Sequence, residues 1–407
     1  MTRSKFLALA LTLLAAPLAV AGDLEDAQAL QQLGKFAEAL PKYEAAVQAD
    51  PANAAAALGL SQVLAGLGRY EAAGKAVDAA RKANPGNAAL LAAKGRACLL
   101  RVMEEEAAEE PDGDLIEGLK SDAARWASEA IKADPANIDA LLLRGQLHQR
   151  DGNDDQARMF FEQAVKADPK SFDAAFALAN HWYAKASADN QNTDLWAKAE
   201  SGFFTCWKLD PKSAVAAANL AHCKAWQKMP PKDVSNAYLR ALALAPTDEK
   251  LLKNTYRWTP AADRPATFQK LADEAPKDVT RKRYLAYALL GAKEFGKARD
   301  VLEGASKLDP KDPYVPLSEG DVVLAEGKSL DDAIDLYVEA LSLFKTQGSI
   351  DNNEYVKLSG TVAFQNTNLS PDQREKLWAA LTSFFPQRAE AANNAGLWFR
   401  DVGKDFK

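Results

Sequence analysis

Prolines that follow a short apolar run recur along this chain at a fixed distance. Pro51 and Pro85 lie 34 residues apart, and the same distance separates Pro135 from Pro169. A period in this range is typical of stacked structural repeats, in which each unit buries its apolar face against its neighbours. The spacing therefore predicts an extended stack of repeats with no single globular core.

The residues between the prolines predict two helices per repeat. In the best copy, apolar residues recur at helical spacing from Ala57 to Leu67, and Gly68 ends this first helix. A second helix follows and ends before Pro85. The second helices share a small–large–small face, which lets antiparallel helices approach closely: Ala39, Tyr43, Ala46; Ala157, Phe161, Ala164; Ala298, Leu302, Ala305. No strand pattern of useful length occurs, so we expect an all-α fold.

The order of these residues resembles a known repeat family. Gly68-Arg69-Tyr70, Ala73, Ala80 and Asn84-Pro85 are similar to the consensus of the tetratricopeptide repeat (TPR). The resemblance implies an α–α superhelical solenoid of about nine to ten helix-turn-helix repeats, some of them degenerate. It divides the chain into a leader (1–21), the solenoid (22–345) and C-terminal helices (346–407), which are degenerate repeats or the start of a further one.

Three intervals depart from the period, and the one from Pro169 to Pro211 contains the polar stretch from Ala188 to Thr193. Between Pro85 and Pro135, the excess holds an acidic run from Glu104 to Asp114, which lacks the ligand spacing of a calcium loop. We expect this run to form a solvated, mobile excursion between two helices. The repeat before Pro276 is short, because Trp258-Thr259-Pro260 interrupts its first helix. Beyond residue 345, helices are expected over 353–364, 370–385 and 389–401.

The first 21 residues have the organisation of a secretory signal peptide. Arg3 and Lys5 precede the apolar run Phe6–Val20, and small residues stand before Gly22. The run is shorter than the ~20 residues of a membrane-spanning helix, so cleavage is favoured over an uncleaved anchor. No later segment is apolar enough to span a bilayer. For a bacterial source, the mature chain is expected in the periplasm or outside the cell.

Charge and motif content argue against several function classes. The formal net charge is -6 at pH 7, with both signs mixed along the chain. The absence of a basic stripe interleaved with aromatics argues against nucleic acid as a partner. The sequence contains no nucleotide-binding glycine loop, nucleophile elbow or zinc-protease helix, so we predict neither an enzyme nor a cofactor.

The cysteines are candidates for a disulfide, and the histidines are candidates for a metal site. Cys223 lies about 10 Å along its helix from the position facing Cys206, beyond the ~7 Å that a disulfide tolerates. We therefore predict that these two thiols and Cys98 are free and buried. His148, His181 and His222 fall on the first helices of successive repeats, where packing or groove-lining roles are favoured over a metal site.

In this family, the resemblance implies that first helices line a concave groove that binds ligands. The early repeats offer mostly small or apolar groove residues: Leu58, Gln62, Ala92 and Arg96. Later repeats offer amides for a peptide backbone, cations for a carboxylate and aromatic contact area. The predicted partner-binding residues are Gln146, Arg150, Phe176, Asn180, Tyr183, Asn219, His222, Trp226, Lys250, Asn254, Arg283 and Tyr287. The matched ligand is an extended peptide or another protein.

A sharper possibility concerns the carboxylate clamp by which some family members hold a chain's C terminus. Asn180, Asn219 and Lys250 fall on three of its five slots, but Phe176 and Asn254 replace the remaining two cations. General groove polarity is therefore favoured over carboxylate capture.

The sequence thus predicts a non-catalytic scaffold or adaptor of the cell envelope, with the groove from Phe176 to Tyr287 as its contact surface. One alternative is an accessory or regulatory module of a longer polypeptide or enzyme complex. It is favoured by the last helix, around Trp398, which resembles a first helix followed by a stop glycine, Gly403, without a second helix. A second alternative is a periplasmic metal- or ligand-binding protein using His181, His222 and Cys223. The oligomeric state is not predicted.

Overall fold

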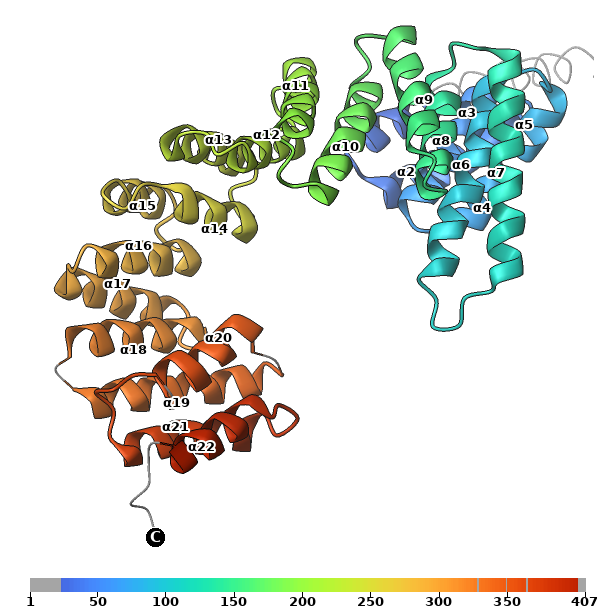
Figure 1. Cartoon of the computed structure of the whole chain (residues 1–407). Coiled ribbons are helices and arrows are strands. Elements are labelled where there is room, and N and C mark those ends of the chain that lie inside the picture. Colours follow the sequence, from blue (N-terminus) through green and yellow to red (C-terminus); the bar gives the residue numbers. More distant parts are fainter. Residues whose placement is uncertain (1–22, 328, 349, 364, 402–407) are drawn as a thin grey trace, which may run out of the picture. The chain divides into compact units, whose positions relative to one another are not determined.

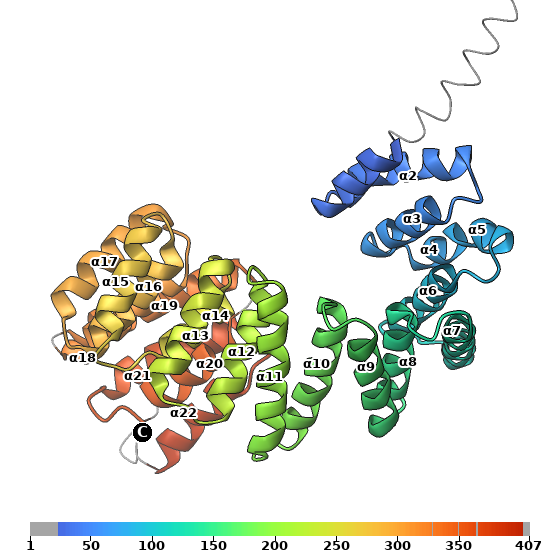
Figure 2. The same cartoon turned by 90° about the horizontal axis from the view of Figure 1, so that it is seen from above.

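The structure, a computed structural model, describes residues 23–401 except 328, 349 and 364. These residues form helices packed in antiparallel pairs, with no strand among them (Figures 1 and 2). The chain divides into two units, Met1–Gln227 (unit 1) and Lys228–Lys407 (unit 2), each considered by itself. The predicted all-α repeat fold is confirmed, whereas the predicted signal segment 1–21 lies outside the described residues.

Unit 1 begins with a helix over residues 23–32. Its further helices alternate between first and second members of a pair. They are α2 (Phe36–Ala49), α3 (Ala54–Gly66), α4 (Tyr70–Ala76), α5 (Asp78–Ala83), α6 (Ala88–Glu106), α7 (Gly113–Ala133), α8 (Ile138–Arg150), α9 (Asp154–Ala167), α10 (Phe172–Ala188), α11 (Thr193–Leu209) and α12 (Ala214–Trp226). In the second pair, α4 and α5 together take the place of one second helix.

Unit 2 continues the same alternation. Its helices are α13 (Pro231–Leu244), α14 (Glu249–Trp258), α15 (Arg264–Glu274), α16 (Val279–Gly291), α17 (Phe295–Leu308), α18 (Tyr314–Glu326), α19 (Leu330–Thr346), α20 (Asn352–Val356), the π-helix η1 (Lys357–Val362), α21 (Pro371–Phe384) and α22 (Glu390–Asp401). As predicted, α14 is short and ends at Trp258.

Most of the period prolines mark helix starts, because a capping residue follows them by two positions. The Asn53 side chain accepts a hydrogen bond from the Ala56 N–H at 3.0 Å, which satisfies a backbone donor of the first turn. The residue before the proline supports the turn, since Asp50 Oδ1 accepts from the Ala52 N–H. The side-chain caps of this kind are Asn53, Asn87, Asn137, Ser171, Ser213, Asp248 and Asp278.

The predicted stop glycines have the left-handed backbone that ends a helix. Gly34, Gly68 and Gly152 have φ angles of 72°, 74° and 74°, a region that favours glycine. In unit 2, Lys293 at φ 62° and Gly327 at φ 70° occupy corresponding turns.

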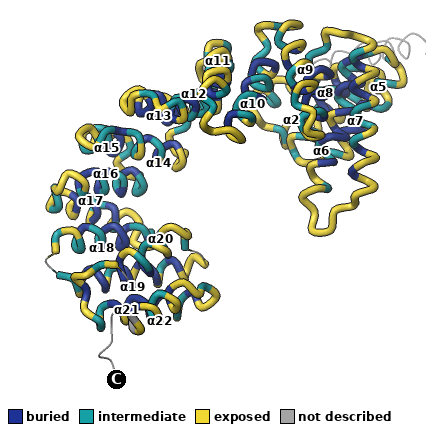
Figure 3. Tube along the Cα trace, in the orientation of Figure 1, coloured by how far each residue is buried: buried dark blue, intermediate teal, exposed yellow. Residues whose placement is uncertain are grey.

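In two helix pairs, α8–α9 and α18–α19, a large side chain is set against a glycine. Phe161 of α9 is 1% exposed, and a Cβ on Gly145 of α8 would lie 2.4 Å from its ring. In unit 2, a Cβ on Gly320 would lie 2.6 Å from Tyr337. Figure 3 shows buried residues, in dark blue, recurring along the paired helices. The small–large–small face seen in the sequence is therefore the contact that holds a pair together.

The acidic run lies at the tip of a hairpin made by two long helices. Helix α6 ends at Glu106 and α7 begins at Gly113, so the exposed residues 107–112 form the expected connection between two helices, and the hairpin extends past its neighbours (Figure 1). Glutamate and alanine are good helix formers, which explains why the extra residues lengthen both helices.

The C-terminal part departs from the expected helix over 353–364. That stretch forms the short α20 and then η1, after which the chain turns toward α21. Arg374, 4% exposed, donates hydrogen bonds to the carbonyls of Ala363, Asn366 and Leu369, which satisfies the backbone of the turn. Trp378 Nε1 donates to the Ser359 carbonyl within η1.

Candidate functional site

One face of the first helices borders a hollow in each unit. Residues four, seven, eight and eleven positions after each period proline share this face, because residues three or four apart are neighbours on a helix. We call it the inner face. In unit 1 it borders a hollow along α3, α6, α8 and α10, and in unit 2 a cavity along α14, α16, α18 and α20.

The hollow of unit 1, here called the N-terminal hollow, has a volume of about 460 Å³. Its surface is mostly apolar, with polar groups along it. The apolar lining residues are Phe36, Leu58, Ala65, Gly66, Ala73, Ala89, Ala92, Ala93, Ala97 and Leu100, and the polar ones are Gln31, Ser61, Gln62, Arg96, Asp139 and Asp173. The many alanines leave open space where larger side chains would fill it.

The polar groups of the N-terminal hollow are partly linked to one another. Tyr43 Oη donates to Gln31 Oε1 at 2.5 Å, and Gln31 Nε2 donates to Gln62 Oε1 at 2.7 Å. Asp139 and Asp173 occupy the same slot of successive repeats, four residues after the proline, and both are exposed. Neither carboxylate has an ion pair with any described residue.

The cavity of unit 2, here called the tyrosine cavity, has a volume of about 320 Å³. It brings together three of the predicted partner-binding residues, Lys250, Arg283 and Tyr287. The remaining lining residues are Glu249, Lys253, Thr280, Tyr284, Tyr314, Asp351, Asn353 and Glu354.

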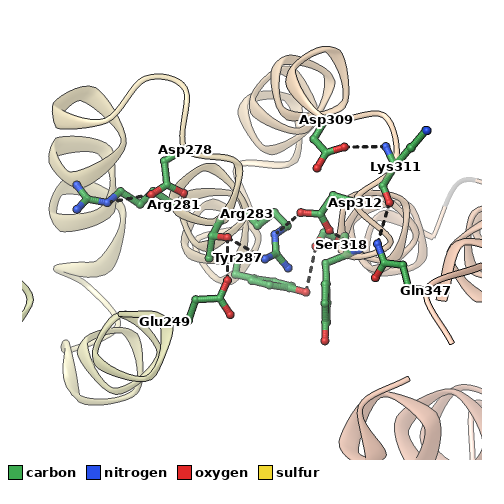
Figure 4. A network of polar contacts seen from close by, with 12 residues as sticks. Glu249, Asp278, Arg281, Arg283, Tyr287, Asp309, Lys311, Asp312, Ser318 and Gln347 are labelled. Atoms are coloured by element: carbon green, nitrogen blue, oxygen red, sulfur yellow. Dashed lines mark hydrogen bonds and ion pairs between the residues drawn. The ribbon is translucent and has the colours of Figure 1, made fainter. Parts of the chain in front are cut away.

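A buried ion pair supports one wall of the tyrosine cavity (Figure 4). Arg283 Nε lies 3.3 Å from Asp312 Oδ2, and the two side chains are only 11% and 13% exposed. The Arg283 guanidinium also lies over the Tyr314 ring at 4.5 Å and donates to Thr280 Oγ1 at 3.2 Å. Burial raises the pKa of Asp312, and the charge of Arg283 opposes this shift. Arg283, predicted as a partner contact, thus already has partners within the chain.

Tyr287 is fixed at the same wall. Its Oη lies 3.0 Å from Ser318 Oγ, and its backbone carbonyl accepts from Tyr256 Oη at 3.2 Å (Figure 4 shows the first contact). Burial raises the pKa of Tyr287 to about 12, so the phenol stays protonated at neutral pH.

Two lysines of the tyrosine cavity remain available to a ligand. Lys250 and Lys253 are exposed, and neither forms an ion pair with a described residue. The carboxylates are engaged: Glu249 accepts from Thr280, Asp351 accepts from the Asn353 N–H, and Glu354 pairs with Lys357 at 3.2 Å. The α14 side of the cavity therefore offers ammonium groups to an incoming anion.

Four further predicted residues meet in an aromatic cluster of unit 1. The Tyr183 ring lies 5.5 Å from that of His222, and the Trp226 ring stacks on Trp196 at 5.5 Å with an interplanar angle of 3°. Phe176 packs edge-on against Phe203. Trp226 is 40% exposed, so the cluster reaches the surface.

Hydrogen bonding fixes the protonation state of His222. Trp226 Nε1 donates to His222 Nε2 at 2.6 Å, and an indole N–H is only a donor, so Nε2 must be unprotonated. Burial lowers the pKa of His222, which favours the neutral ring.

The remaining predicted residues are distributed over both units. Gln146, Asn180 and Asn219 lie on the first helices of unit 1, and Arg150 there pairs with Glu106. Asn254 lies half-buried on α14 of unit 2. Because the clamp residues Asn180 and Asn219 belong to unit 1 and Lys250 to unit 2, carboxylate capture remains a prediction.

The sequence reasoning did not select the N-terminal hollow as a site. Leu58, Gln62, Ala92 and Arg96 were expected to face inward as mostly small or apolar residues, and all four line the hollow, but none was among the predicted partner-binding residues. The sequence pattern that could have predicted this hollow is the run of alanines at successive inner-face positions. Small side chains at these positions leave open space.

The predicted burial of Cys98, Cys206 and Cys223 as free thiols is confirmed. Burial raises the pKa of Cys206 to about 11 and that of Cys223 to about 12, so both thiols stay protonated and unreactive at neutral pH. Within the described ranges, no three His, Cys, Asp or Glu side chains gather closely enough to hold a metal ion. His181, one member of the metal alternative, is 1% exposed and packs against Phe161 and Trp182.

No helix in the described part of the chain combines the length and the apolar character needed to cross a bilayer.

Comparison with known proteins supports the resemblance seen in the sequence. Two family models described as tetratricopeptide repeat match residues 24–88 and 138–181. No curated protein sequence matches the chain. The matched stretches include α3 and α8, two first helices that line the N-terminal hollow.

Solved structures of repeat proteins are similar in fold. A thermophilic TPR protein of Thermus thermophilus is 18% identical, with a TM-score of 0.45 over 51% of this chain and 99% of its own. YrrB, a TPR protein with an unusual peptide-binding site, is 16% identical, with a TM-score of 0.33 over 52% and 96%. Yeast Tom70 is 13% identical, with a TM-score of 0.40 over 95% and 89%.

Proposed function

We propose that this protein is a non-catalytic scaffold of the cell envelope that binds an extended segment of another protein on the inner faces of its first helices. Tetratricopeptide repeats generally mediate binding of proteins or peptides, and stacked repeats present extended surfaces for such contacts. The proposal assigns the protein an adaptor role and assigns no reaction to it.

The tyrosine cavity is the observation that carries this proposal. It places Lys250 and Lys253, which have no ion pair with a described residue, beside three tyrosine rings on the face where a partner chain can approach. Tyrosine rings provide contact area at low entropic cost, and ammonium groups bind carboxylates. The favoured ligand at this cavity is a partner segment with an acidic side chain or a terminal carboxylate near Lys250.

The proposed location rests on the leader sequence. Arg3, Lys5 and the apolar run to Val20 support export, so the partner is sought among periplasmic or extracellular proteins. Fractionation of the source cells, with mass determination of the mature N terminus, tests this part separately. A mature chain that retains Met1 in the cytosol would refute export.

Affinity capture from an envelope extract tests the binding role. The immobilised full chain is compared with a Lys250→Glu, Lys253→Glu variant, which reverses two exposed charges at the cavity. The matched control is Lys270→Glu, Lys277→Glu, which reverses two exposed charges of the same unit away from the cavity. We expect one envelope protein to be enriched by the wild type and the control, and to be lost with the cavity variant.

Two outcomes would contradict the proposal. Either no protein is enriched over an unrelated bait, or the enriched protein is recovered equally well with the cavity variant. The second result would leave protein binding in place but remove the tyrosine cavity as its site.

A further inference from the structure

The N-terminal hollow is chemically unlike the tyrosine cavity, although both lie on the inner face. It is larger, its floor is made of alanines and leucines, and the two carboxylates that border it have no described partner. We propose that the N-terminal hollow docks a partner segment in which an apolar residue is accompanied by lysine or arginine. This inference depends on the proposed function in one respect, because both place a docking site on the inner face.

The floor of the hollow determines the apolar part of the ligand. Leu58, Ala89, Ala92 and Ala97 come from α3 and α6 and leave a volume that no side chain of the described residues fills. Ala92 and Ala97 are 1% and 3% exposed, so the surface below the hollow is already closely packed. An apolar side chain entering from a partner would remove its own surface and that of the floor from water.

The polar groups beside the floor suit the backbone of an extended segment. Ser61 is 5% exposed and lines the hollow, and its hydroxyl has no hydrogen-bond partner among the described residues. Gln62 uses its carbonyl oxygen to accept from Gln31, so its amide N–H donors can bind an incoming carbonyl. The backbone N–H and carbonyl groups of an extended segment can pair with both side chains.

The charge at the edge of the hollow determines the flanking residues of the ligand. Asp139 and Asp173 stand 34 residues apart in sequence, at the same slot of adjacent repeats, so their carboxylates follow the direction of the stack. The complement of two exposed carboxylates is a cationic side chain next to the apolar one. Arg96 also lines the hollow and can donate a hydrogen bond to a backbone carbonyl of the same segment.

Binding of defined peptides to the full chain tests this inference. Three labelled peptides with blocked termini share a central Ile-Leu-Leu sequence and carry four flanking residues that are all lysine, all glutamine or all glutamate. By fluorescence anisotropy at low salt, we expect the lysine peptide to bind about tenfold more tightly than the glutamate peptide.

Two variants assign this binding to the hollow. Asp139→Asn, Asp173→Asn should reduce the lysine-over-glutamate preference to about threefold or less, because the attraction is removed. Ala89→Phe fills the half-buried floor and should weaken the lysine and glutamine peptides alike by about tenfold. The matched control is Asp155→Asn, Asp194→Asn, which removes two exposed first-turn carboxylates from second helices and should leave the preference unchanged.

The outcomes separate this inference from the proposed function. Lys250→Glu, Lys253→Glu should leave lysine-peptide binding unchanged, whereas it abolishes capture at the tyrosine cavity if the proposed function is correct. The inference is overturned if the lysine peptide does not bind, if all three peptides bind equally, or if the preference survives in Asp139→Asn, Asp173→Asn.

Discussion

Units 1 and 2 present the same backbone face with opposite chemistry. Seven residues after the period proline, unit 1 places Ala92 and unit 2 places Arg283. Four residues after it, unit 1 has Asp139 and Asp173, whereas unit 2 has Lys250. The alanines leave an open hollow bordered by carboxylates, and the larger residues of unit 2 form a polar wall beside lysines. The repeat therefore determines where a binding surface lies, and the residues at its slots determine what the surface accepts.

The largest expected effect comes from removing Arg283 from the polar wall of unit 2. Arg283→Ala leaves Asp312 buried without its cation, and breaking a buried pair in this way costs about 3 kcal/mol of unfolding free energy. Hydrogen exchange measured by mass spectrometry during denaturation should show the loss in unit 2 and not in unit 1. Lys282→Ala, at the neighbouring position, is the control and should change little. An unchanged denaturation midpoint of unit 2 would show that the ion pair is unimportant.

A smaller effect tests the contact within a helix pair, which both units contain. Gly145→Ala in unit 1 and Gly320→Ala in unit 2 place a Cβ at 2.4 Å and 2.6 Å from the Phe161 and Tyr337 rings. Overpacking of this kind costs about 1–3 kcal/mol, so both units should lose similar stability. Gly118 and Gly304 also lie within helices but have no neighbouring atom within 4 Å of an added Cβ. Their replacement by alanine should stabilise by about 0.5–1 kcal/mol. A loss in only one unit would contradict the idea of a common helix-pair contact.

The elements that the two units share were accessible from the sequence. The capping residues, the stop glycines and the small–large–small faces act locally, through the first turn, the left-handed turn and the contact within one pair. Gly68 and Phe161 could therefore be assigned from spacing alone, whereas the cap at Asn53 was recognised only in the structure. The lengthening of α6 and α7 was missed because composition alone did not distinguish a polar loop from a polar helix.

The candidate sites were less accessible, because they depend on residues from several repeats. Lys250, Arg283 and Tyr287 were selected individually, and their common cavity requires α14, α16 and α18 to stack in register. The burial of Arg283 against Asp312 could not be seen in spacing. The N-terminal hollow was missed because empty space is created by what neighbouring alanines lack.

Acid pH should affect the two units differently. All three histidines of the chain lie in unit 1, and burial lowers the pKa of His148, His181 and His222. The stability that these neutral histidines contribute is thus fully present above their unfolded-state pKa near 6.5. It is lost as the pH falls through their lower folded-state pKa. In unit 2, burial raises the pKa of Asp312 and Glu319. Acidification should therefore stabilise unit 2 through these two carboxyl groups, which is the opposite of its effect through the histidines of unit 1.

Between pH 7.5 and 5, we expect unit 1 to lose on the order of 1 kcal/mol relative to unit 2, the size of the Trp226–His222 hydrogen bond. Hydrogen exchange at several pH values, on the wild type and on His222→Gln, measures this difference. Glutamine accepts a hydrogen bond from Trp226 without titrating, so the variant should show a weaker pH dependence. Equal losses in both units would contradict the assignment.

The smallest expected effect comes from exchanging single charges at one slot. Asp173→Lys places in unit 1 the residue that unit 2 has at the corresponding position, Lys250, and should weaken lysine-peptide binding about threefold to fivefold. Exposed charges are screened, so this difference should shrink toward zero near 1 M salt, where the Debye length is about 3 Å. The contact with the alanine floor does not depend on charge, so the glutamine peptide should bind the variant and the wild type equally at every salt concentration. If Asp173→Lys weakened the glutamine peptide as much as the lysine peptide, the slot would act through the shape of the hollow. The opposite chemistry of the two inner faces would then not explain their ligand preference.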